Sequence, residues 1–480
     1  MSLAACSLKP VSPDQMTRLH DATLRILAET GIVFESEEAL AIFKKHGARV
    51  EGRTVFIDEK MVDDAIQSAP STYRHRGRND ARSILVGHRQ KRLVLSGAYG
   101  PVNIYDPENG RRPGTMEDFI NLTKLSHALD SVSVVGGLPV DPSDLEPKHK
   151  TFQMLYQILR HTDKPIWAFS SLGEDVLNMF KMVEIAYGSS AQVWEEHVVA
   201  APVCPLSPLK YARTASETIL TYARHRQPLY INSCIMAGVS GPISLLGTAT
   251  LMNTEILGGL VLAQLTAPGT PIVYVPGGTV ADMRSGSYIC GSPESNLIVM
   301  VGLQMALDQY LLPTRVMGGL TDSKAIDYQA GAEVMQNLFM PILAGAHFLN
   351  NVLGTMESQM TVSLGKYLLD VESIERVVRV MEGISGDDTD LSVDLIQQEA
   401  HKGNYLMNPS TLKKCRSRWQ PSIADWDTYN KWQKGGSLNA EDRGHLRSKE
   451  ILANSPDSLL PKDIELDLRK YAEKRVSVAI

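Results

Sequence analysis

The stretch TRVMGGLTDSK, residues 314–324, joins a short strand-like run to a polar segment through two glycines. Its first four residues have the pattern of a strand, and the glycines end that strand. A hydroxyl, a carboxylate and an ammonium group follow at Thr321, Asp322 and Lys324. A strand that ends in this way delivers polar groups into a cleft. The stretch therefore predicts one strand–helix unit of a parallel sheet, with a functional site at the end of the strand.

The same pattern of a short apolar run followed by a longer helical stretch repeats along the chain. Proline introduces several of these runs, at a position where a missing backbone donor costs little. Eight is the number of strands in a closed barrel. The sequence therefore predicts an α/β fold of the (β/α)8 or TIM-barrel type. The runs begin near Arg92, Ser131, Lys164, His197, Pro228, Pro271, Pro313 and Ala346.

The two ends of the chain differ from this repeating part. Ser12 and Gln15 form a capping box that starts a helix, with Pro13 at the first helical position, and Gly31 ends the helix. Further helices are expected over 36–47 and 59–67. We therefore expect an N-terminal helical extension over 1–90, the barrel over 91–370 and a C-terminal helical region over 371–480 that makes a subunit or partner contact. The protein is expected to be a homo-oligomer.

Composition excludes several classes of function. The formal net charge is −6 and the pI is near 6.1, which argues against binding of nucleic acid through a basic face. No run of about 18 apolar residues is present to span a membrane, and no signal-peptide pattern opens the chain. We expect a soluble, cytoplasmic protein. Its five scattered cysteines are expected to be reduced thiols.

In a parallel barrel the active site forms where the strands end, so residues after each run are the candidates. Several have a second interpretation. Asp322 and Lys324 could form only a loop salt bridge, and His347 could be a core histidine. The pairs Gly277-Gly278 and Gly318-Gly319 could serve barrel packing, or could admit a flat macrocycle close to the backbone.

Several segments resemble the trimethylamine methyltransferase family. The segment G-L-T-D-S-K-x-x-D-x-Q-A-G-x-E over 319–333 carries the resemblance most clearly. Four further segments follow the family order: 201–209, 253–265, 291–294, and 344–346 with 354–357. In that family pyrrolysine occupies the position that is Leu320 here. The resemblance therefore implies a member without pyrrolysine, which needs a methyl donor that is already activated.

The resemblance implies a methyltransferase that moves a methyl group from a quaternary amine to cob(I)alamin. A quaternary ammonium leaves as a neutral tertiary amine, so it needs neither protonation nor a Lewis acid. Glycine betaine is the expected donor, with proline betaine or carnitine as alternatives. The cobalamin is expected on a separate corrinoid protein, because the chain lacks a D-x-H-x-x-G motif.

Site residues follow from this interpretation. Leu320, Asp322 and Lys324 are expected at the catalytic position, and the four glycines at 277, 278, 318 and 319 near the corrinoid. A methylated cation calls for aromatic faces and a carboxylate, which Tyr99, Tyr274, Phe348 and Glu357 could supply. Arg284, Lys324 and His347 are the options for binding a betaine carboxylate.

Metal chemistry and two other functions remain as alternatives. The sequence has no C-x2-C pair, no H-E-x-x-H and no close His/Cys cluster, so we expect no metal site. The barrel could instead be a lyase or aldolase with Lys324 as a Schiff-base lysine. It could also be a non-catalytic betaine-binding protein.

Overall fold

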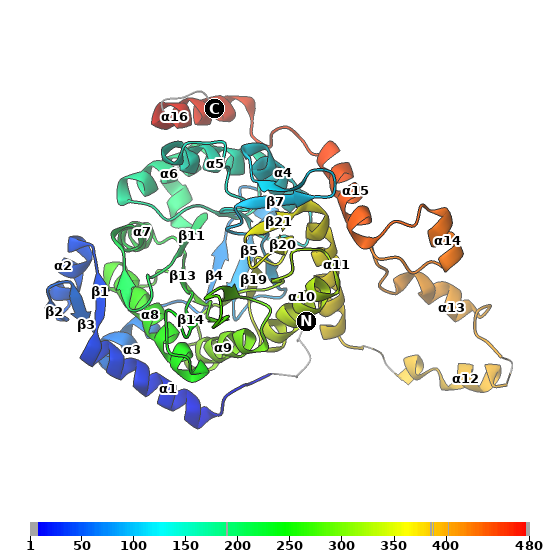
Figure 1. Ribbon diagram of the computed structural model, residues 1–480, viewed down its shortest axis with the longest axis horizontal. Coiled ribbons are helices and arrows are strands. Elements are labelled where there is room, and N and C mark those ends of the chain that lie inside the picture. Colours follow the sequence, from blue (N-terminus) through cyan, green and yellow to red (C-terminus); the bar gives the residue numbers. More distant parts are fainter. Residues whose placement is uncertain (1–7, 189–190, 385, 387, 402, 477–480) are drawn as a thin grey trace.

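Short parallel strands occupy the centre of the computed structural model, and helices surround them (Figure 1). The structure describes residues 8–188, 191–384, 386, 388–401 and 403–476. Each of the eight predicted runs contains a strand. The strands are β6 (Val94–Leu95), β9 (Val135–Gly136), β10 (Ile166–Trp167), β11 (Val199–Val203), β13 (Leu229–Ser233), β15 (Ile272–Pro276), β18 (Arg315–Met317) and β19 (Phe348–Asn350).

A helix follows each of these strands along the chain. Parallel neighbours need such a crossover, because a strand must return to its starting end before the next can begin. The helices are α4 (Met116–Ala128), α5 (Pro147–His161), α6 (Gly173–Ala186), α7 (Arg213–Arg224), α8 (Leu245–Thr266), α9 (Pro293–Gln304), α10 (Tyr328–Leu343) and α11 (Leu364–Met381). A 3-10 turn, η3 (Ala191–Glu195), follows α6, and α9 continues into the π-helix η4 (Met305–Gln309).

The parallel strands form two regular sheets. One has five strands in the order β15-β13-β11-β10-β9, and the other has three in the order β18-β19-β6. Isolated parallel bridges pair Ser96 with Val134 and Tyr274 with Thr314, between the edges of the two sheets. The predicted α/β class is confirmed, whereas the regular ladders do not run as one closed ring.

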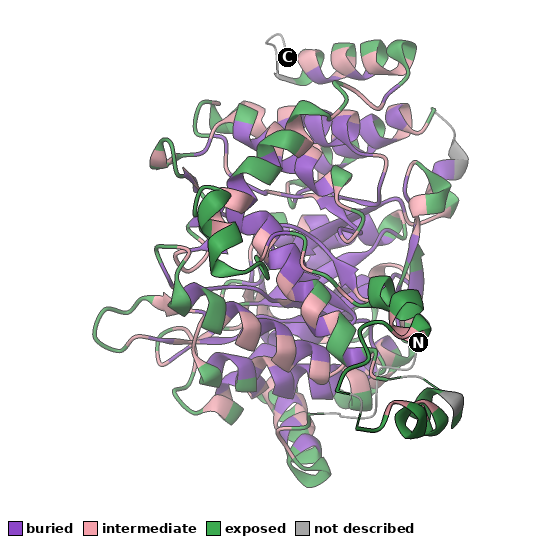
Figure 2. Ribbon diagram, turned by 90° about the vertical axis from the view of Figure 1, so that its right-hand side faces the viewer, coloured by how far each residue is buried: buried purple, intermediate pink, exposed green. Residues whose placement is uncertain are grey.

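Side chains of the strands alternate between two hydrophobic layers, because successive strand residues point to opposite faces. Val273 and Val275 pack in an inner cluster with Trp167 and Tyr230, whereas Tyr274 between them packs in the larger cluster on the helix side. Figure 2 shows buried residues on the central strands and the inner sides of the helices.

The N-terminal part is not purely helical, so the expected helical extension over 1–90 is not confirmed. The predicted capping box at Ser12 and the stop at Gly31 are present. The helices are α1 (Pro13–Arg25), the π-helix η1 (Ile26–Thr30), α2 (Glu37–Lys45), α3 (Glu59–Ser68) and the 3-10 turn η2 (Asp80–Arg82). Between them lie β1 (Ile32–Phe34), β2 (Arg49–Glu51), β3 (Thr54–Phe56), β4 (Thr72–His75) and β5 (Ile84–Gly87). These strands are too short to show a clear period of two in the sequence.

The hairpin of β4 and β5 covers the amino ends of the central strands. Tyr73, Ile84 and Val86 belong to the inner cluster. The hydroxyl of Tyr73 lies 2.6 Å from that of Tyr230 on β13. The interior is therefore filled at this end, which leaves the carboxyl ends of the strands for a site.

Small sheets stand over those carboxyl ends. A four-stranded sheet has the order β20-β21-β7-β8, and a three-stranded one has the order β14-β16-β17. A further strand, β12, extends the sheet of β1, β3 and β2. These strands are β7 (Asn103–Asp106), β8 (Gly110–Pro113), β12 (Lys210–Tyr211), β14 (Met236–Ala237), β16 (Thr279–Ala281), β17 (Tyr288–Ile289), β20 (Thr355–Met356) and β21 (Thr361–Ser363).

The C-terminal part is helical over its described residues, and it begins inside α11, so the predicted boundary at 370–371 falls within a helix. α15 packs on α11, and α16 packs on α5 and α6. The elements are η5 (Asp388–Leu391), α12 (Val393–Glu399), α13 (Pro409–Lys414), η6 (Cys415–Ser417), α14 (Tyr429–Lys434), α15 (Ala440–Ala453) and α16 (Lys462–Val476).

Helix α8 is long and apolar enough to cross a membrane by length and composition. However, 78% of its most apolar window is buried inside the protein. It packs against α1, α3, α7 and α9, so α8 has the surroundings of a core helix.

Candidate active site

Five side chains gather at the carboxyl ends of the central strands, in a region that we call the mouth: Tyr99, Cys204, Asn232, Cys234 and Tyr288. The amide of Asn232 donates to the sulfur of Cys204 at 3.5 Å. Electrostatic interactions link Tyr99 with Cys204, and Tyr288 with Cys234. The residues come from separate strands and loops, and parallel strand direction brings them to one place.

Arg315 on β18 is the charged group beneath the mouth. Its side chain is 2% exposed, and its guanidinium lies over the ring of Trp167, 4.9 Å from the centroid. Nε donates to Oδ1 of Asn350 at 2.6 Å. Burial lowers the pKa of Arg315 to about 10, so the group stays charged at neutral pH.

No ion pair joins Arg315 to any carboxylate in the part of the chain that the structure describes. Its Nη1 has no hydrogen-bond partner, and neither has Oδ1 of Asn232 or Nδ2 of Asn350. Buried polar groups in folded proteins are normally paired, so unpaired ones need an explanation. An isolated buried charge is especially costly. Here two donors and one acceptor lie unpaired in one small region.

The thiols of Cys204 and Cys234 are exposed to the mouth. The strands around them nevertheless remove much of the water, and this raises the pKa of Cys234 to about 12. The same desolvation raises the pKa of Cys204 above its usual value, although the Asn232 hydrogen bond opposes it. Both thiols are therefore protonated at neutral pH, which makes them poor nucleophiles and poor metal ligands.

Trp167 and Tyr99 lie beside the guanidinium. Tyr99 meets Trp167 edge-on, with ring centroids 5.8 Å apart. Tyr288 lies on the hairpin of β16 and β17 above the strands. Burial raises the pKa of both tyrosines well above the usual range, so their hydroxyls are neutral. Aromatic faces beside a buried anion-binding group suit a small molecule with separate cationic and anionic ends.

The segment after β19, which includes the turn between β20 and β21, has an unusual backbone conformation. Glu357, Ser358 and Gln359 have φ values of 51°, 51° and 73°, and Asn351 has 55°. Positive φ is uncommon for residues other than glycine, and such strain gathers at functional sites. The conformation lets Gln359 donate to the hydroxyl of Tyr288 at 3.2 Å and accept from Asn351 at 2.9 Å. The loop therefore fixes the position of Tyr288.

Asp322 organises the neighbouring loops. It accepts hydrogen bonds from the backbone of Cys290 at 3.0 Å and Gly291 at 2.8 Å, and from the hydroxyl of Ser358 at 2.6 Å. Burial raises the pKa of Asp322, but these hydrogen bonds outweigh it and hold the pKa below the usual value. Lys324 is exposed and donates to the carbonyl of Asp322 at 2.7 Å. Neither group has a free reactive atom in a buried position.

Leu320 lies beside this network, 4% exposed. Its carbonyl accepts from the amide of Asn337 at 2.7 Å. Leu320 also lines a cavity of about 30 Å³, together with Gly278, Tyr288 and Cys290. That volume suits a single water and is too small for a quaternary amine.

The other predicted cation and carboxylate ligands lie elsewhere. Glu357 forms a two-point ion pair with Arg111, at 2.7 and 3.1 Å. The side chain of Arg284 is 94% exposed and lies near Asp282. The structure therefore does not bring Glu357 or Arg284 to Arg315.

Three predicted residues occupy the protein interior away from the mouth. The hydroxyl of Tyr274 donates to Asn253 on α8 at 2.8 Å, so this ring lies on the helix side. Phe348 is fully buried against Trp167 and Tyr230. His347 precedes β19, where its Nδ1 accepts from the backbone of Thr314 at 3.1 Å. Burial lowers the pKa of His347 to about 3, so it is neutral.

The predicted macrocycle-facing glycines are explained by packing. A Cβ at Gly277 would lie 2.6 Å from Oδ1 of Asn232, and one at Gly278 would lie 2.5 Å from Ile298. At Gly319, where φ is +65°, it would lie 2.6 Å from the carbonyl of Val352. Gly318 has the most room, with 3.2 Å to Val352. The protein itself therefore requires small residues at three of these positions.

No group of three or more His, Cys, Asp or Glu side chains suited to a metal ion occurs within the described residues. The absence of a metal site stays a prediction. A larger cavity lies at the amino ends of the strands and contains none of the predicted site residues.

Sequence reasoning missed Arg315, Trp167 and Tyr288. The signal for Arg315 was present, because a charged residue inside a short central strand is unusual. Trp167 and Tyr288 gave no comparable signal. Tyr288 reaches the mouth only because its hairpin folds over the strand ends.

Comparison with known proteins agrees with this architecture. The sequence model of the family "Trimethylamine methyltransferase (MTTB)" matches residues 3–479. The chain is therefore a methyltransferase, and it belongs to the trimethylamine methyltransferase family.

Among its relatives is the glycine betaine methyltransferase of Desulfitobacterium hafniense strain Y51, with 33% identity over 97% of this chain and 96% of that protein. The trimethylamine methyltransferase MttB of Desulfitobacterium hafniense strain DSM 10664 / DCB-2 is also 33% identical, over 96% of this chain and 93% of its own.

A solved structure with a similar fold is the monomethylamine methyltransferase MtmB of Methanosarcina barkeri. Its TM-score is 0.54 at 13% sequence identity, over 93% of this chain and 88% of that one. At this identity the likeness concerns the fold alone.

Proposed function

We propose that this methyltransferase takes its methyl group from a betaine, a quaternary ammonium compound that carries a carboxylate, and transfers it to the corrinoid of a partner protein. The observation that carries the proposal is Arg315, a buried guanidinium without a carboxylate partner among the described residues. A substrate carboxylate would supply the missing negative charge. It would also accept hydrogen bonds from Nη1 of Arg315 and Nδ2 of Asn350.

The cationic end of the donor fits the aromatic side of the mouth. With the carboxylate at Arg315, the methylated nitrogen would lie toward Tyr99 and Tyr288. Each aromatic contact with a methylated cation contributes on the order of 0.5–2 kcal/mol. The orientation directs a methyl group toward the opening, where the acceptor must approach. We therefore propose Arg315, in place of Arg284, Lys324 or His347, as the carboxylate ligand.

The reaction requires the protein mainly to position the methyl donor. The C–N bond breaks, its electron pair stays on nitrogen, and a neutral tertiary amine leaves. The corrinoid supplies the nucleophile that accepts the methyl group. The chain binds the donor, orients one methyl group and excludes water. Leu320 offers hydrocarbon only, so we propose that it shapes the site without bonding to the substrate, while Asp322 positions the loop of Cys290 and Gly291.

The corrinoid partner is supported by relatives and by the open mouth. The proline betaine:corrinoid methyltransferase of Eubacterium limosum is 31% identical over 86% of this chain and 86% of its own. Cys204 and Cys234, at the carboxyl ends of β11 and β13, are exposed residues, as a mouth open to a partner requires. The chain has no cobalamin-ligating D-x-H-x-x-G motif. A separate corrinoid protein is therefore the proposed acceptor.

Glycine betaine is the first donor to test, because it is the smallest of the three betaines considered and a 33% identical relative bears its name. Proline betaine and carnitine are the alternatives. All three carry a quaternary nitrogen and a carboxylate.

We also infer that the eight central strands form one closed (β/α)8 barrel. The bridges of Ser96 with Val134 and of Tyr274 with Thr314 would join the two sheets at both edges. The division near residues 90 and 370 and the cytoplasmic location stay predictions.

The proposal is tested by following the loss of cob(I)alamin absorbance with purified protein. The donors to compare are glycine betaine, proline betaine, carnitine, choline and trimethylamine. Choline has no carboxylate and cannot form the charged hydrogen-bonded pair with Arg315. Methyl transfer from choline should therefore be slower than from glycine betaine, by on the order of 100-fold. Trimethylamine should be inactive. Comparable rates with trimethylamine and the betaines would contradict the proposal, as would inactivity with every betaine.

A further inference from the structure

Two segments beside the mouth carry exposed apolar side chains. Ile243 is 65% exposed, Met283 is 64% exposed and Val239 is 54% exposed. Val239 and Ile243 lie between β14 and α8, and Met283 lies in the turn between β16 and β17. We call these three side chains the rim patch. Single exposed apolar residues are common, so their grouping and their place in the fold must show whether they have a use.

The side chains of Ile243 and Met283 lie together in space. A Cβ at Gly238 would lie 2.9 Å from Cδ1 of Ile243 and 2.8 Å from Sδ of Met283, so both side chains cover this glycine. The pairing of the strands explains their proximity. β14 and β16 run parallel, with Met236 opposite Thr279, and the segments that follow them leave in the same direction. Two separate parts of the chain therefore build one surface.

The backbone beneath the rim patch is fixed by hydrogen bonds. The carbonyl of Met236 accepts from the amides of Val239 and Ser240, both at 3.0 Å. In the other segment, the carbonyl of Asp282 accepts from the amide of Gly286 at 2.7 Å. A surface that is already ordered loses little conformational entropy when a partner binds. The rim patch is thus a preformed surface.

The rim patch borders the mouth on both of its segments. Cys234, a residue of the mouth, shortly precedes β14. Tyr288, another, begins β17 and pairs with Ala281 on β16, in the hairpin whose turn carries Met283. A large molecule that covers the mouth must therefore also lie over the rim patch.

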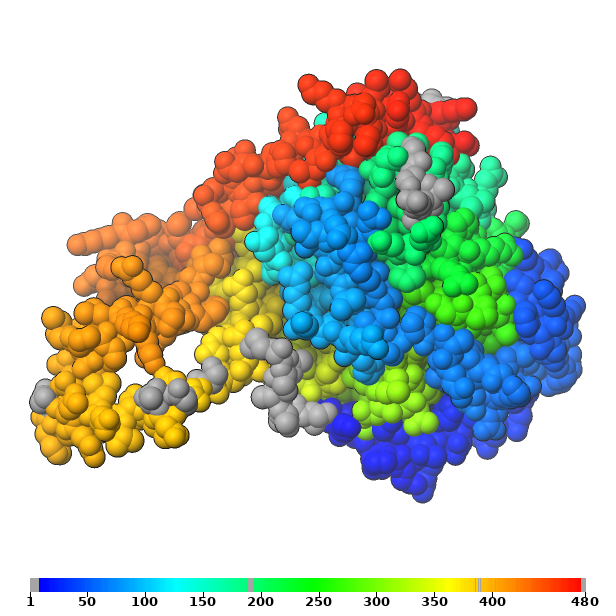
Figure 3. Space-filling view, turned by 180° about the vertical axis from the view of Figure 1, so that it is seen from behind, coloured from blue at the N-terminus to red at the C-terminus, as the bar shows by residue number. Residues whose placement is uncertain are grey.

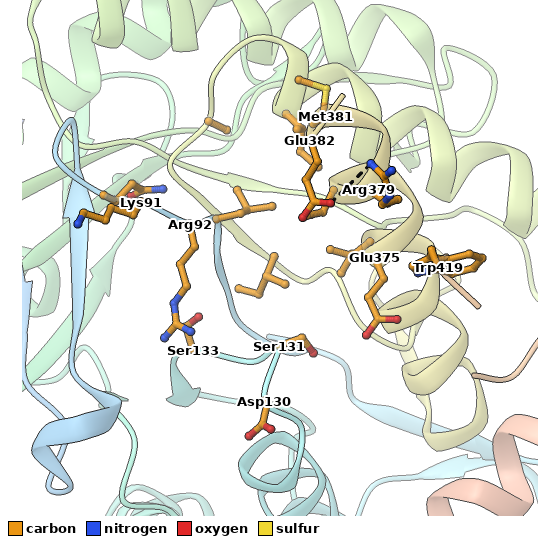
Figure 4. Close-up of a pocket in the computed structure, with 17 residues that line it drawn as sticks. Lys91, Arg92, Asp130, Ser131, Ser133, Glu375, Arg379, Met381, Glu382 and Trp419 are labelled. Carbon is orange, nitrogen blue, oxygen red and sulfur yellow. Dashed lines mark ion pairs between the residues drawn. The ribbon is translucent and has the colours of Figure 1, made fainter. Parts of the chain in front are cut away.

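A methyl-accepting protein can approach the mouth from one side only. Figure 1 looks onto the carboxyl ends of the central strands, with β4 and β5 behind them. Figure 3 shows the opposite side, where the segment of β4 and β5, in blue, covers the amino ends. A cavity of about 480 Å³ lies at that end (Figure 4), but none of the mouth residues lines it. The acceptor must therefore come from the side on which the rim patch lies.

We propose that the rim patch binds the corrinoid protein that accepts the methyl group, an inference that rests on the proposed function. The corrinoid must reach the mouth, so the protein that carries it lies over the rim. Apolar side chains of that protein cover Ile243 and Met283, as the centre of a protein–protein interface requires. Arg284, which follows Met283 and is 94% exposed, fits an acidic side chain of the partner. A second copy of this chain on the same patch would block the path of the acceptor.

The test is the dissociation constant of the full chain with a purified corrinoid protein, measured by isothermal titration calorimetry. The probes are the corrinoid proteins with a D-x-H-x-x-G motif from the organism that makes this chain. The double variant I243S/M283S should raise the dissociation constant on the order of 10-fold or more. The control L311S/V380S changes side chains that are 57% and 63% exposed, before β18 and at the end of α11, and should keep the parent's value.

Methyl transfer to free cob(I)alamin separates docking from the reaction itself. Free cob(I)alamin needs no contact with a partner protein, so I243S/M283S should methylate it at the parent's rate. Transfer to the corrinoid protein should require on the order of 10-fold more acceptor for half the maximal rate. Because Ile243 and Met283 are exposed, the variant should fold, and circular dichroism checks this.

Three outcomes would overturn the proposal. They are a parent that binds none of the corrinoid proteins, a rim variant with the parent's dissociation constant, and a rim variant that loses transfer to free cob(I)alamin as well. Failure of the proposed function has a different signature. A parent that binds the corrinoid protein through the rim patch but takes a methyl group from no betaine would contradict the proposed donor and still support this docking surface.

Discussion

At the scale of single residues, Arg315 both destabilises the empty protein and is the proposed ligand of the substrate carboxylate. A buried charge without a partner destabilises the folded state, and its free polar atoms add to that cost. Proteins keep such groups where a ligand completes them. The same side chain should therefore weaken the empty protein and strengthen the bound one.

This dual role predicts opposite effects of one substitution. Arg315→Met keeps much of the side-chain volume and removes the charge. It should therefore raise the melting temperature of the protein without donor. It should also abolish the rise in melting temperature that glycine betaine gives the parent. The matched control is Arg112→Met. Arg112 is paired with Asp118 at 2.6 and 2.9 Å, so that variant should melt at a lower temperature. A lower melting temperature for Arg315→Met would show that the charge is internally compensated.

Site residues could be predicted only where the neighbouring sequence indicates their position in the fold. Tyr99 lies in the mouth, on the loop that follows β6, as predicted from its place after the first apolar run. Tyr274 and Phe348 were assigned from residue type, and only the alternation of the strand decides which side each ring occupies. Glu357 follows its strand as predicted, yet Arg111, far away in sequence, pairs with it. Such long-range partners leave no local signal.

At the scale of elements, the strand–helix repeat could be predicted well. All eight runs contain strands because apolar runs bounded by proline and glycine carry a strong local signal. The hairpin of β4 and β5 could not be predicted, since Tyr73, Ile84 and Val86 are buried only by the interior that they cover. Its apolar residues were too few to distinguish it from a loop.

The turn after β18 gives a test at this scale. Gly319 has φ +65°, and a Cβ there would lie 2.6 Å from the carbonyl of Val352. Gly319→Ala should lower the free energy of unfolding by about 2–4 kcal/mol, measured by chemical denaturation. Gly331→Ala on α10 is the control. Its Cβ would meet nothing within 4 Å, so this change should be neutral or stabilising by up to about 1 kcal/mol. Equal effects of the two changes would refute this reason for the glycine.

At the scale of the whole molecule, buried histidines set the response to acid. Burial lowers the pKa of His75, His161 and His347 to about 3 and that of His127 to about 4. Their stabilising contribution is complete above the unfolded value of about 6.5 and is lost as the pH falls through about 4 for His127 and about 3 for the other three, because the unfolded chain binds protons that the folded one does not. Burial raises the pKa of Asp370 to about 6, although the attraction of Lys366 lowers it. Below about pH 6 the folded chain therefore binds one proton at Asp370 more readily than the unfolded chain does, and this opposes the loss of stability.

Four histidines outweigh one carboxyl group. The melting temperature should therefore be lower at pH 5.5 than at pH 7.5, and His347→Gln should reduce the difference. An unchanged or higher melting temperature at pH 5.5 would mean that these histidines are not buried as neutral groups.

The central claim is that Arg315 selects a methyl donor by its carboxylate. The most direct measurement is the ratio of kcat/KM for glycine betaine over choline, in the parent and in Arg315→Gln. The two donors share a trimethylammonium group and differ in the carboxylate. We predict a ratio on the order of 100 in the parent and a fall to within about 3-fold of unity in the variant, through loss of the betaine rate. The same ratio in both proteins, with both folded, would contradict the account.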